Sequence, residues 1–172
     1  LQDSVITNPH FGVSYAFQVP SGDMEQRFGN NSNVGLNFHI KDKNNWFYGV
    51  EGSFFFGREV KEPGLLSNLL TDDGEIIDNV GAIAQVVVQE RGWTVGLSGG
   101  RVFNFVGPNP NSGILVKVGV GFMQHKIRLE HQENRITQLE GEYLKGYDRL
   151  TNGLMTSQFV GYYHMSSRRI IN

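Results

Sequence analysis

Alternation between bulky and small side chains is the feature that most restricts how this chain folds. In residues 11–19, FGVSYAFQV, the odd positions are large and mostly apolar, whereas the even positions hold glycine, serine, alanine and glutamine. Successive side chains of a β-strand point to opposite faces, so this pattern predicts a strand with one bulky face and one slim face. The fold then depends on which of the two faces meets water.

The same pattern recurs along the chain and predicts an all-β fold. Clear alternation marks residues 33–41, 47–57, 93–100 and 114–123, and two less regular apolar segments cover residues 81–89 and 154–165. Residues 41–45 and 90–92 are typical of tight turns, and residues 21–32, 58–80 and 130–153 of long polar links, of which residues 63–70 favour two helical turns. The sequence therefore predicts seven strands in a single domain, residues 1–172.

Charge is almost absent from the predicted strands. The chain has 15 Lys and Arg and 17 Asp and Glu, yet apart from Lys41 at the last position of its segment only Glu51 and Lys117 are charged within them. The outer face of a soluble sheet normally carries charged and polar residues, because that face contacts water. An exterior rich in glycine would also weaken the strands with no packing in return. A soluble sandwich or lipocalin-like barrel is therefore disfavoured.

These observations favour a barrel with its bulky face toward lipid and its slim face inside a narrow lumen. Backbone groups in lipid must all be paired, and a closed sheet achieves this without helices. Strands of about 9–11 residues match the span of a tilted transmembrane β-strand. We therefore predict an antiparallel up-and-down transmembrane β-barrel in the outer membrane of a bacterium, in contact with outer-membrane lipid.

The number of strands bears on whether the sequence is complete. Single-chain bacterial barrels usually have even strand numbers, so we expect about eight strands rather than seven. A further strand starting at Arg168 would contribute only Ile170 and Ile171 as apolar residues. The sequence is therefore expected to be incomplete at its C-terminus. A barrel of about eight strands is filled by its own side chains, so no pore is expected.

The two charged residues within the strands are predicted to face the lumen. Glu51 and Lys117 would satisfy each other there, together with the polar side chains of His39, Lys41 and Gln158. The sequence therefore predicts a hydrogen-bonded polar network inside the barrel.

Composition excludes several other classes of protein. A formal net charge of −2 and a sequence pI of about 6.2 offer no basic surface to nucleic acid. The absence of cysteine excludes disulfides, thiolate metal sites and a cysteine nucleophile. No run of about 18 apolar residues is present, which excludes a helical membrane protein.

One short stretch, HMSS at residues 164–167, has the composition of a hydrolytic site. His164 and Ser166 are two positions apart and would share a face of a strand, where they could act as base and nucleophile. The pair resembles the H-x-S pair of outer-membrane lipid A deacylases. However, no acidic partner is assigned, and alternation places His164 on the lumen side with Thr156 and Gln158, away from lipid. A strand-end turn is the favoured interpretation, and no catalytic residue is predicted.

Two further regions contain residue types that are typical of metal sites or partner contacts. Residues 71–75, TDDGE, supply oxygen ligands without the spacing of a calcium loop, and the five histidines form no spaced ligand set, so no metal or cofactor is predicted. In the long link at residues 130–153, Tyr143, Tyr147 and Arg149 are candidate partner contacts, because Tyr and Arg dominate interface hot spots.

Four segments are similar to the glycine-rich outer-membrane β-barrel proteins of Bacteroidota. They are VPSGDMEQRFGNNSNVGLNF (19–38), FYGVEGSFFFG (47–57), GPNPNSGILVKVGVGFMQHKI (107–127) and LKGYDRLTNG (144–153). Barrels of this kind occur as accessory subunits of outer-membrane secretion and assembly machines. The resemblance thus implies a structural or binding role among other envelope proteins, and it transfers no catalytic residue.

The resulting expectation is a non-enzymatic outer-membrane barrel that docks to other envelope proteins through its long loops or its outer wall. Two alternatives stay open at this point. One is an outer-membrane lipid hydrolase that uses His164 and Ser166, and the other is a soluble lipocalin-like binding barrel.

Overall fold

The computed structural model describes residues 4–62, 64–131, 136, 146–147 and 149–166. In chain order its elements are β1 (Asn8–Gln18), α1 (Asp23–Arg27), β2 (Asn31–Lys41), β3 (Trp46–Gly57), the 3₁₀ helix η1 (Ser67–Leu69), β4 (Val86–Phe103), β5 (Gly113–His131) and β6 (Thr151–Tyr163). No helix among the described residues is long and apolar enough to cross a membrane.

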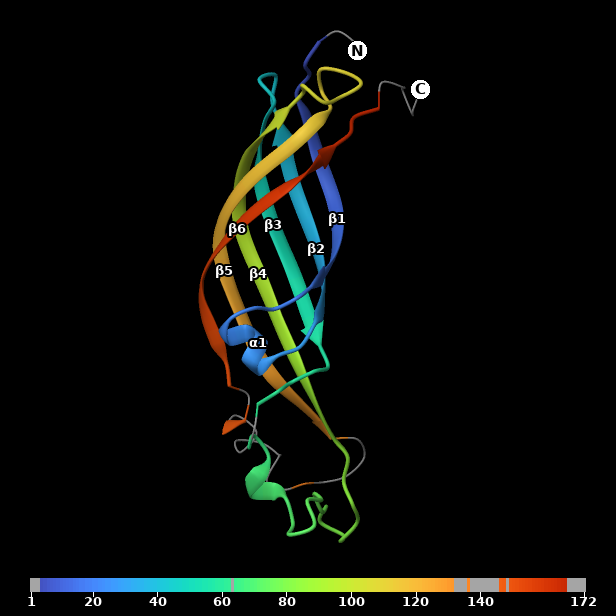
Figure 1. Ribbon diagram of the computed structural model, residues 1–172, viewed down its shortest axis with the longest axis vertical. Coiled ribbons are helices and arrows are strands. Elements are labelled where there is room, and N and C mark those ends of the chain that lie inside the picture. Colours follow the sequence, from blue (N-terminus) through green and yellow to red (C-terminus); the bar gives the residue numbers. More distant parts are fainter. Residues whose placement is uncertain (1–3, 63, 132–135, 137–145, 148, 167–172) are drawn as a thin grey trace.

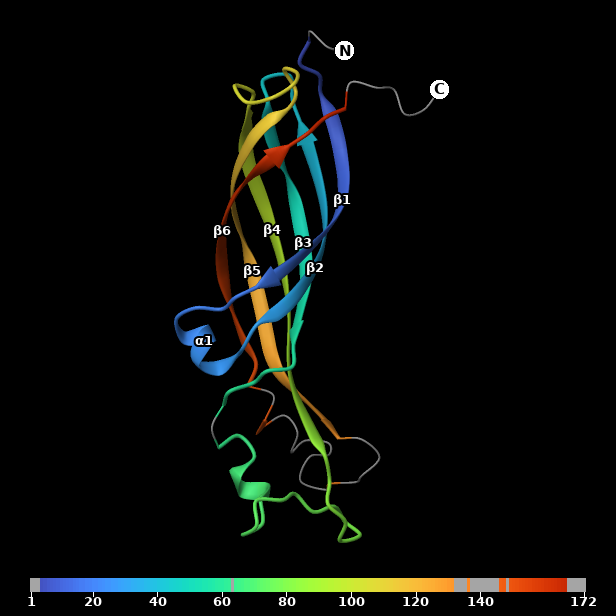
Figure 2. The ribbon, with the colours of Figure 1, turned by 45° about the vertical axis from the view of Figure 1, so that its right-hand side comes forward.

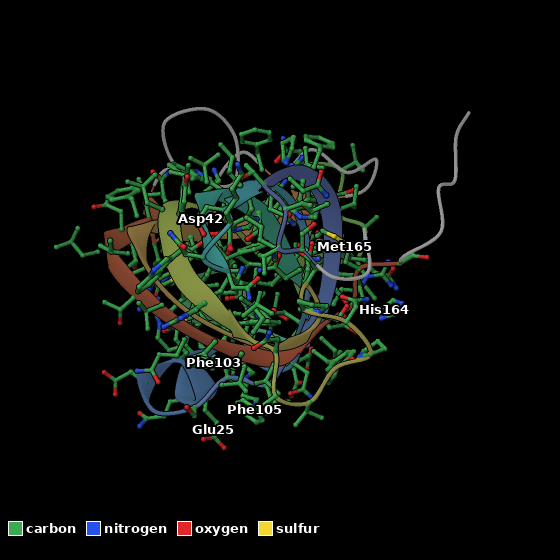
Figure 3. All side chains as sticks on the ribbon, turned by 90° about the horizontal axis from the view of Figure 1, so that it is seen from above. Glu25, Asp42, Phe103, Phe105, His164 and Met165 are labelled. Carbon is green, nitrogen blue, oxygen red and sulfur yellow. The ribbon has the colours of Figure 1, made fainter. Side chains whose placement is uncertain are left out.

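The six strands form one antiparallel sheet in the order β1-β2-β3-β4-β5-β6, so each strand pairs with its neighbours in sequence. This confirms the predicted all-β, up-and-down arrangement. The sheet curls around the long axis of the molecule (Figure 1), and seen from above it forms an incomplete ring (Figure 3). Among the described residues no ladder joins β1 to β6, so the sheet is open and the expected closure into a barrel of about eight strands is absent.

The predicted turn at residues 90–92 is wrong, which accounts for six strands where seven were expected. These residues lie inside β4, where Glu90 pairs with Gly57 on one side and with Ile127 on the other. Glu90 is fully buried on the inner face, and Arg91, on the opposite face, forms an ion pair with Glu130. Because the alternation continues through these two charged residues, charge here lies within a long strand rather than in a turn.

The predicted tight turn after residue 41 is confirmed. Asp42 Oδ1 accepts hydrogen bonds from the backbone N–H groups of Asn44 (2.8 Å) and Trp46 (2.9 Å). Asn45 adopts a left-handed backbone conformation (φ 63°), which asparagine tolerates better than most residues. Of the two helical turns expected at residues 63–70, the described residues form only the short η1.

Two small hydrophobic cores lie at opposite ends of the molecule. Phe47, Val102 and Leu115 pack inside the curled sheet, together with Tyr163. Beyond the other end, a second cluster packs together parts of the long links; its buried members are Ile76, Ala84, Leu129 and Ile136, and its partly buried members are Leu65, Leu66, Leu69, Val86, Val88 and Tyr147. We call this second region the lobe.

The start of β1 and the end of β6 lie at the same end of the molecule, opposite α1 and the lobe (Figure 2). The loop between β4 and β5 ties them together there. Asn111 Oδ1 accepts a hydrogen bond from the backbone N–H of Ile6 (3.0 Å), and the Asn109 side chain donates to Met165 O (2.9 Å). Side chains therefore hold the two edges of the sheet near each other at this end.

Candidate functional site

The two faces of the sheet differ sharply in composition. The outer face carries the bulky residues of the alternation, and its large exposed side chains include Phe11, Val13, Tyr15, Phe17, Val34, Leu36, Phe38, Tyr48, Val50, Phe54, Phe56, Trp93, Val95, Leu97, Val116, Val118, Val120, Val160 and Tyr162. The register places these residues side by side on neighbouring strands, for example Val13 against Leu36 and Val50 against Leu97. The outer face is thus a continuous apolar surface.

At several inner positions the neighbouring strand approaches too closely for any side chain larger than that of glycine. A Cβ atom at Gly49 would lie 2.0 Å from Phe38 O, and one at Gly100 would lie 2.1 Å from Val116 O. On the outer face, by contrast, a Cβ at Gly99 would meet nothing within 4 Å. Larger side chains at the inner positions would therefore push neighbouring strands apart, and this gives the slim face a steric reason.

Glu51 is the centre of a polar network on the inner face. Its Oε1 accepts a hydrogen bond from Ser98 Oγ (2.8 Å), lies 2.9 Å from His39 Nε2, and is paired with Lys117 Nζ. Four adjacent strands, β2 to β5, each supply one member. The His39 side chain is 3% exposed and that of Lys117 14%, whereas that of Glu51 is 39% exposed because it borders the interior space.

The network has the residue types of a serine hydrolase triad but not its geometry. His39 Nε2 lies 2.9 Å from Ser98 Oγ and also 2.9 Å from Glu51 Oε1, so the serine and the carboxylate share one ring nitrogen. In a triad the carboxylate binds the other nitrogen and orients the ring, which leaves Nε2 to take the serine proton. Here Ser98 donates directly to the carboxylate. The arrangement therefore neutralises the charge of Glu51 rather than activating Ser98.

We call the end of the sheet at which Asn109 and Asn111 contact the chain near β1 and β6 the tied end. Aromatic rings cover the polar network on the side toward this end. The Lys117 Nζ lies 5.1 Å from the ring centroid of Phe159 and 5.9 Å from that of Phe47, distances at which a ring attracts a cation. The His39 ring packs against Phe47 with centroids 4.6 Å apart. Beyond Phe47, Tyr163 Oη and His10 Nε2 are 2.6 Å apart, which connects β6 to β1.

A second polar group is buried nearer the lobe. Asn31 Nδ2 donates to Glu90 Oε2 (3.0 Å), and the ring of His125 packs edge-on against Phe28 with centroids 5.4 Å apart. Glu90 and Phe28 are fully buried. The inner face thus has polar groups at two levels along the axis of the sheet.

The predicted lumen residues fall into three places. Glu51, Lys117 and His39 are brought together as described. Lys41 is buried at the tied end, where its Nζ donates to Asn111 Oδ1 (3.0 Å). Gln158 lies opposite Val118 in the register, on the outer face, so its assignment to the lumen is wrong. Sequence reasoning missed Ser98 as a member of the network. Alternation along β4 places Ser98 on the inner face, but its closeness to Glu51 follows only from the pairing of β3 with β4.

The face predicted for His164 is also wrong. Thr156 pairs with Val120 and Gln158 with Val118, which puts the even positions of β6 on the outer face. His164 follows β6 on the same alternation, is exposed, and stacks on Tyr162 with ring centroids 6.5 Å apart; Figure 3 places it at the margin of the ring. The alternation misled here because both faces of β6 mix apolar and polar residues.

The candidate partner contacts in the long link have internal roles. Tyr147 packs against the lobe cluster. Arg149 Nη1 donates to Glu62 Oε2 (3.0 Å), and Glu62 is also paired with Arg27, so this carboxylate joins three separate links. Tyr143 lies outside the described residues.

The remaining candidate motif, TDDGE at residues 71–75, forms a tight turn. The backbone N–H of Thr71 donates a hydrogen bond to Glu75 O (2.8 Å). Among the described residues, no cluster of three or more His, Asp or Glu side chains is placed to hold a metal ion.

In the part of the chain that the structure describes, charged side chains on the outer face of the sheet lie only toward its ends. On β4, Arg91 and Arg101 face outward, and between them the outward residues are Trp93, Val95, Leu97 and Gly99. The Arg101 guanidinium lies 5.8 Å from the ring centroid of Trp46 and 6.0 Å from that of Phe103. Toward the lobe, Phe54 packs on Phe56 and Trp93 on Phe122. An uncharged apolar band is thus bordered by aromatic rings and charges at both ends.

Comparisons with family models, curated proteins and solved structures find no match for this chain.

Proposed function

We propose that the protein is a non-enzymatic component of the bacterial outer membrane, in which the apolar band of the curled sheet contacts lipid. The observation that carries the proposal is the distribution of charge on the described strands: Glu51 and Lys117 face inward, and outward charges lie only toward the ends of the band. Ten steps of β4 separate Arg91 from Arg101, about 33 Å of strand, which at a tilt of about 40° rises roughly 25 Å. That height matches the apolar band of transmembrane barrels.

The aromatic residues support the same placement. Trp and Tyr side chains favour the boundary between lipid and water, and Trp46, Tyr162 and Trp93 lie near the two ends of the band. Arg101 beside Trp46 and Phe103 has the surroundings of a cation at the headgroup level.

The open edges of β1 and β6 place a condition on this proposal. Backbone groups left unpaired in hydrocarbon cost several kcal/mol each, so both edges have to be paired within the bilayer. β1 and β6 run antiparallel, hence they satisfy this by pairing with each other or with an even number of intervening strands. The membrane form is therefore a closed antiparallel barrel.

Membrane residence is tested by fractionation of cells that produce the protein. We expect it in the outer-membrane fraction, resistant to a carbonate wash, floating with lipid on a density gradient and released by detergent. Recovery of a monomer from the soluble fraction without detergent would contradict the proposal and favour a soluble binding barrel.

Within the envelope we assign the protein an accessory or structural role, with docking to other envelope proteins through the lobe. Three apolar residues near the turn at Asp78 support this: Ile77 is 44% exposed, Val80 87% and Ile83 62%. Exposed apolar residues grouped in this way mark interaction surfaces. They precede β4 and lie outside the band, which separates docking from membrane insertion.

The docking role is tested by affinity purification in mild detergent. We expect envelope proteins to co-purify with the unaltered protein, and to be lost from the Val80→Lys/Ile83→Lys variant, which still floats with lipid. Thr71→Lys, in the neighbouring turn, is the matched control and retains them. Equal recovery with both variants would exclude this part of the lobe as the docking surface.

A further inference from the structure

The curled sheet encloses a cavity that the membrane role does not use. The cavity measures about 490 Å³. Every strand contributes residues to its wall, and these residues lie away from the tied end of the sheet. It extends from Glu51 and Ser98 to the segment Val19–Met24, which follows β1 and leads into α1. Its size lies within the range of about 300–1,000 Å³ that is usual for small-molecule sites.

One part of the cavity wall offers free hydrogen-bonding groups. The side chains of Ser14, Asn33, Asn37 and Ser157 border the cavity, and in the described part of the chain none of them is hydrogen-bonded to another protein group. Glu51, which lines the cavity, adds a further acceptor, since His39, Ser98 and Lys117 all contact its Oε1 and leave Oε2 available. A ligand in the cavity would thus meet donors and acceptors from three different strands and a carboxylate oxygen.

The rest of the wall is apolar. Phe55, Met123 and Met155 line the cavity on the side nearer the lobe, and Met24 of α1 borders it beyond the end of β1. Glu51 is the only charged residue among the described lining residues, and Lys117 already neutralises it. The cavity therefore suits a molecule that combines several hydrogen-bonding groups with an apolar face and carries no net charge.

We propose that this cavity binds an uncharged, hydroxyl-rich small molecule of the size of a mono- or disaccharide. The hydroxyl groups of such a molecule pair with Ser14, Asn37 and Glu51 Oε2, and its C–H face packs on Phe55. The molecule enters from water at the end of β1, past Met24, and not through the apolar band. This site goes beyond the membrane role, and its failure would leave membrane residence untouched.

Binding is tested by titration calorimetry on the purified protein in a zwitterionic detergent, because detergents with sugar headgroups would compete. The probes are N-acetylglucosamine and maltose, with glucuronate as the charged counterpart of similar size. We expect saturable binding of the neutral sugars and at least about tenfold weaker binding of glucuronate, because its carboxylate would lie close to that of Glu51. Absence of saturable binding, or equal affinity for all three, would overturn the proposal.

Two variants locate the site. Asn37→Leu removes a hydrogen-bonding group from the wall, and Ser14→Phe, on the edge strand β1, fills part of the cavity with the least disturbance of the sheet. Each is expected to weaken neutral-sugar binding about fivefold or more, since one lost hydrogen bond or blocked contact is worth about 1 kcal/mol. Gln158→Leu, on the outer face, is the matched control and leaves the affinity unchanged. Unchanged affinity in both cavity variants would place the binding elsewhere and overturn the proposal.

Discussion

The outer and inner faces belong to the same six strands, yet they obey different physical constraints. On β4, Trp93, Val95 and Leu97 point outward while Thr94, Gly96 and Ser98 point inward. The outer face has open space beside it, for example at Gly99, which leaves room for large apolar side chains. The inner face carries glycine and small hydrogen-bonding residues where neighbouring strands approach one another closely.

The contrast explains why charge is tolerated inside and not outside. Glu51 and Lys117 neutralise each other, and His39 and Ser98 contact the Glu51 carboxylate, so this ion pair on the inner face leaves neither charge unpaired. An equivalent charge in the middle of the outer face would have no partner and, in lipid, no water. The same sheet can therefore carry polar residues on its inner face and apolar residues on its outer face.

The sharpest way to break this comparison is a charge in the middle of the outer face. Leu97 is 64% exposed between Val50 and Val120, and Leu97→Arg is expected to lower the free energy of unfolding in lipid vesicles by about 2–4 kcal/mol. The measurement is urea unfolding followed by tryptophan fluorescence.

Phe103→Arg is the matched control, on the same strand and face but next to Arg101 at the end of the band. There the expected loss is about 0–1 kcal/mol, because an arginine side chain reaches water from that level. If Leu97→Arg were as mild as Phe103→Arg, the outer face would not be in lipid.

Gly99 and Gly100 are adjacent on β4 but face outward and inward, so the same substitution at each position compares the two faces. Gly100→Val places a Cβ against Val116 O on the inner face and is expected to destabilise the protein by about 1–3 kcal/mol through overpacking. Gly99→Val points into open space on the outer face and is expected to be neutral or slightly stabilising. Denaturant midpoints of the two variants measure the difference, and equal midpoints would show that the inner face has room to spare.

The inner network gives a smaller effect. Lys117→Met leaves the Glu51 carboxylate without its cation, and the expected loss of unfolding free energy is about 1–2 kcal/mol, reduced by the partial exposure of Glu51. In the double variant Glu51→Leu/Lys117→Met no charge is left unpaired, so much of this loss is recovered. A double-mutant cycle with additive losses would mean that the two side chains stabilise the fold independently.

Much of this architecture follows from local alternation. The bulky and slim positions of residues 11–19, 33–41 and 47–57 are those that the register later places on opposite faces, because each side-chain pattern spans a whole strand. The meeting of Glu51, His39 and Lys117 was also predictable, since all three are polar residues at slim positions of strands that carry almost no charge.

Other features depend on contacts between segments distant in sequence. Glu90 and Arg91 resemble a turn locally, and only pairing with β3 and β5 reveals that they continue β4. In β6, Met155, Ser157 and Phe159 are no smaller or more polar than Leu154, Thr156 and Gln158, so alternation alone does not choose a face. The hydrogen bonds of Asn109 and Asn111 to both ends of the sheet were likewise hidden within a loop sequence.

The smallest effect is expected at Gln158, a polar residue on the apolar outer face. Its neighbour in the ladder is Val118, which is 62% exposed in the middle of the band. If this surface contacts lipid, Gln158→Leu removes an amide from hydrocarbon and is expected to raise the free energy of unfolding in vesicles by about 0.5–1 kcal/mol. Gln124→Leu, on the same face beside Lys126, is the matched control near water and should change stability less. A loss of stability for Gln158→Leu would mean that its amide has a polar partner in the membrane form, which a strand pairing with the free edge of β6 would supply.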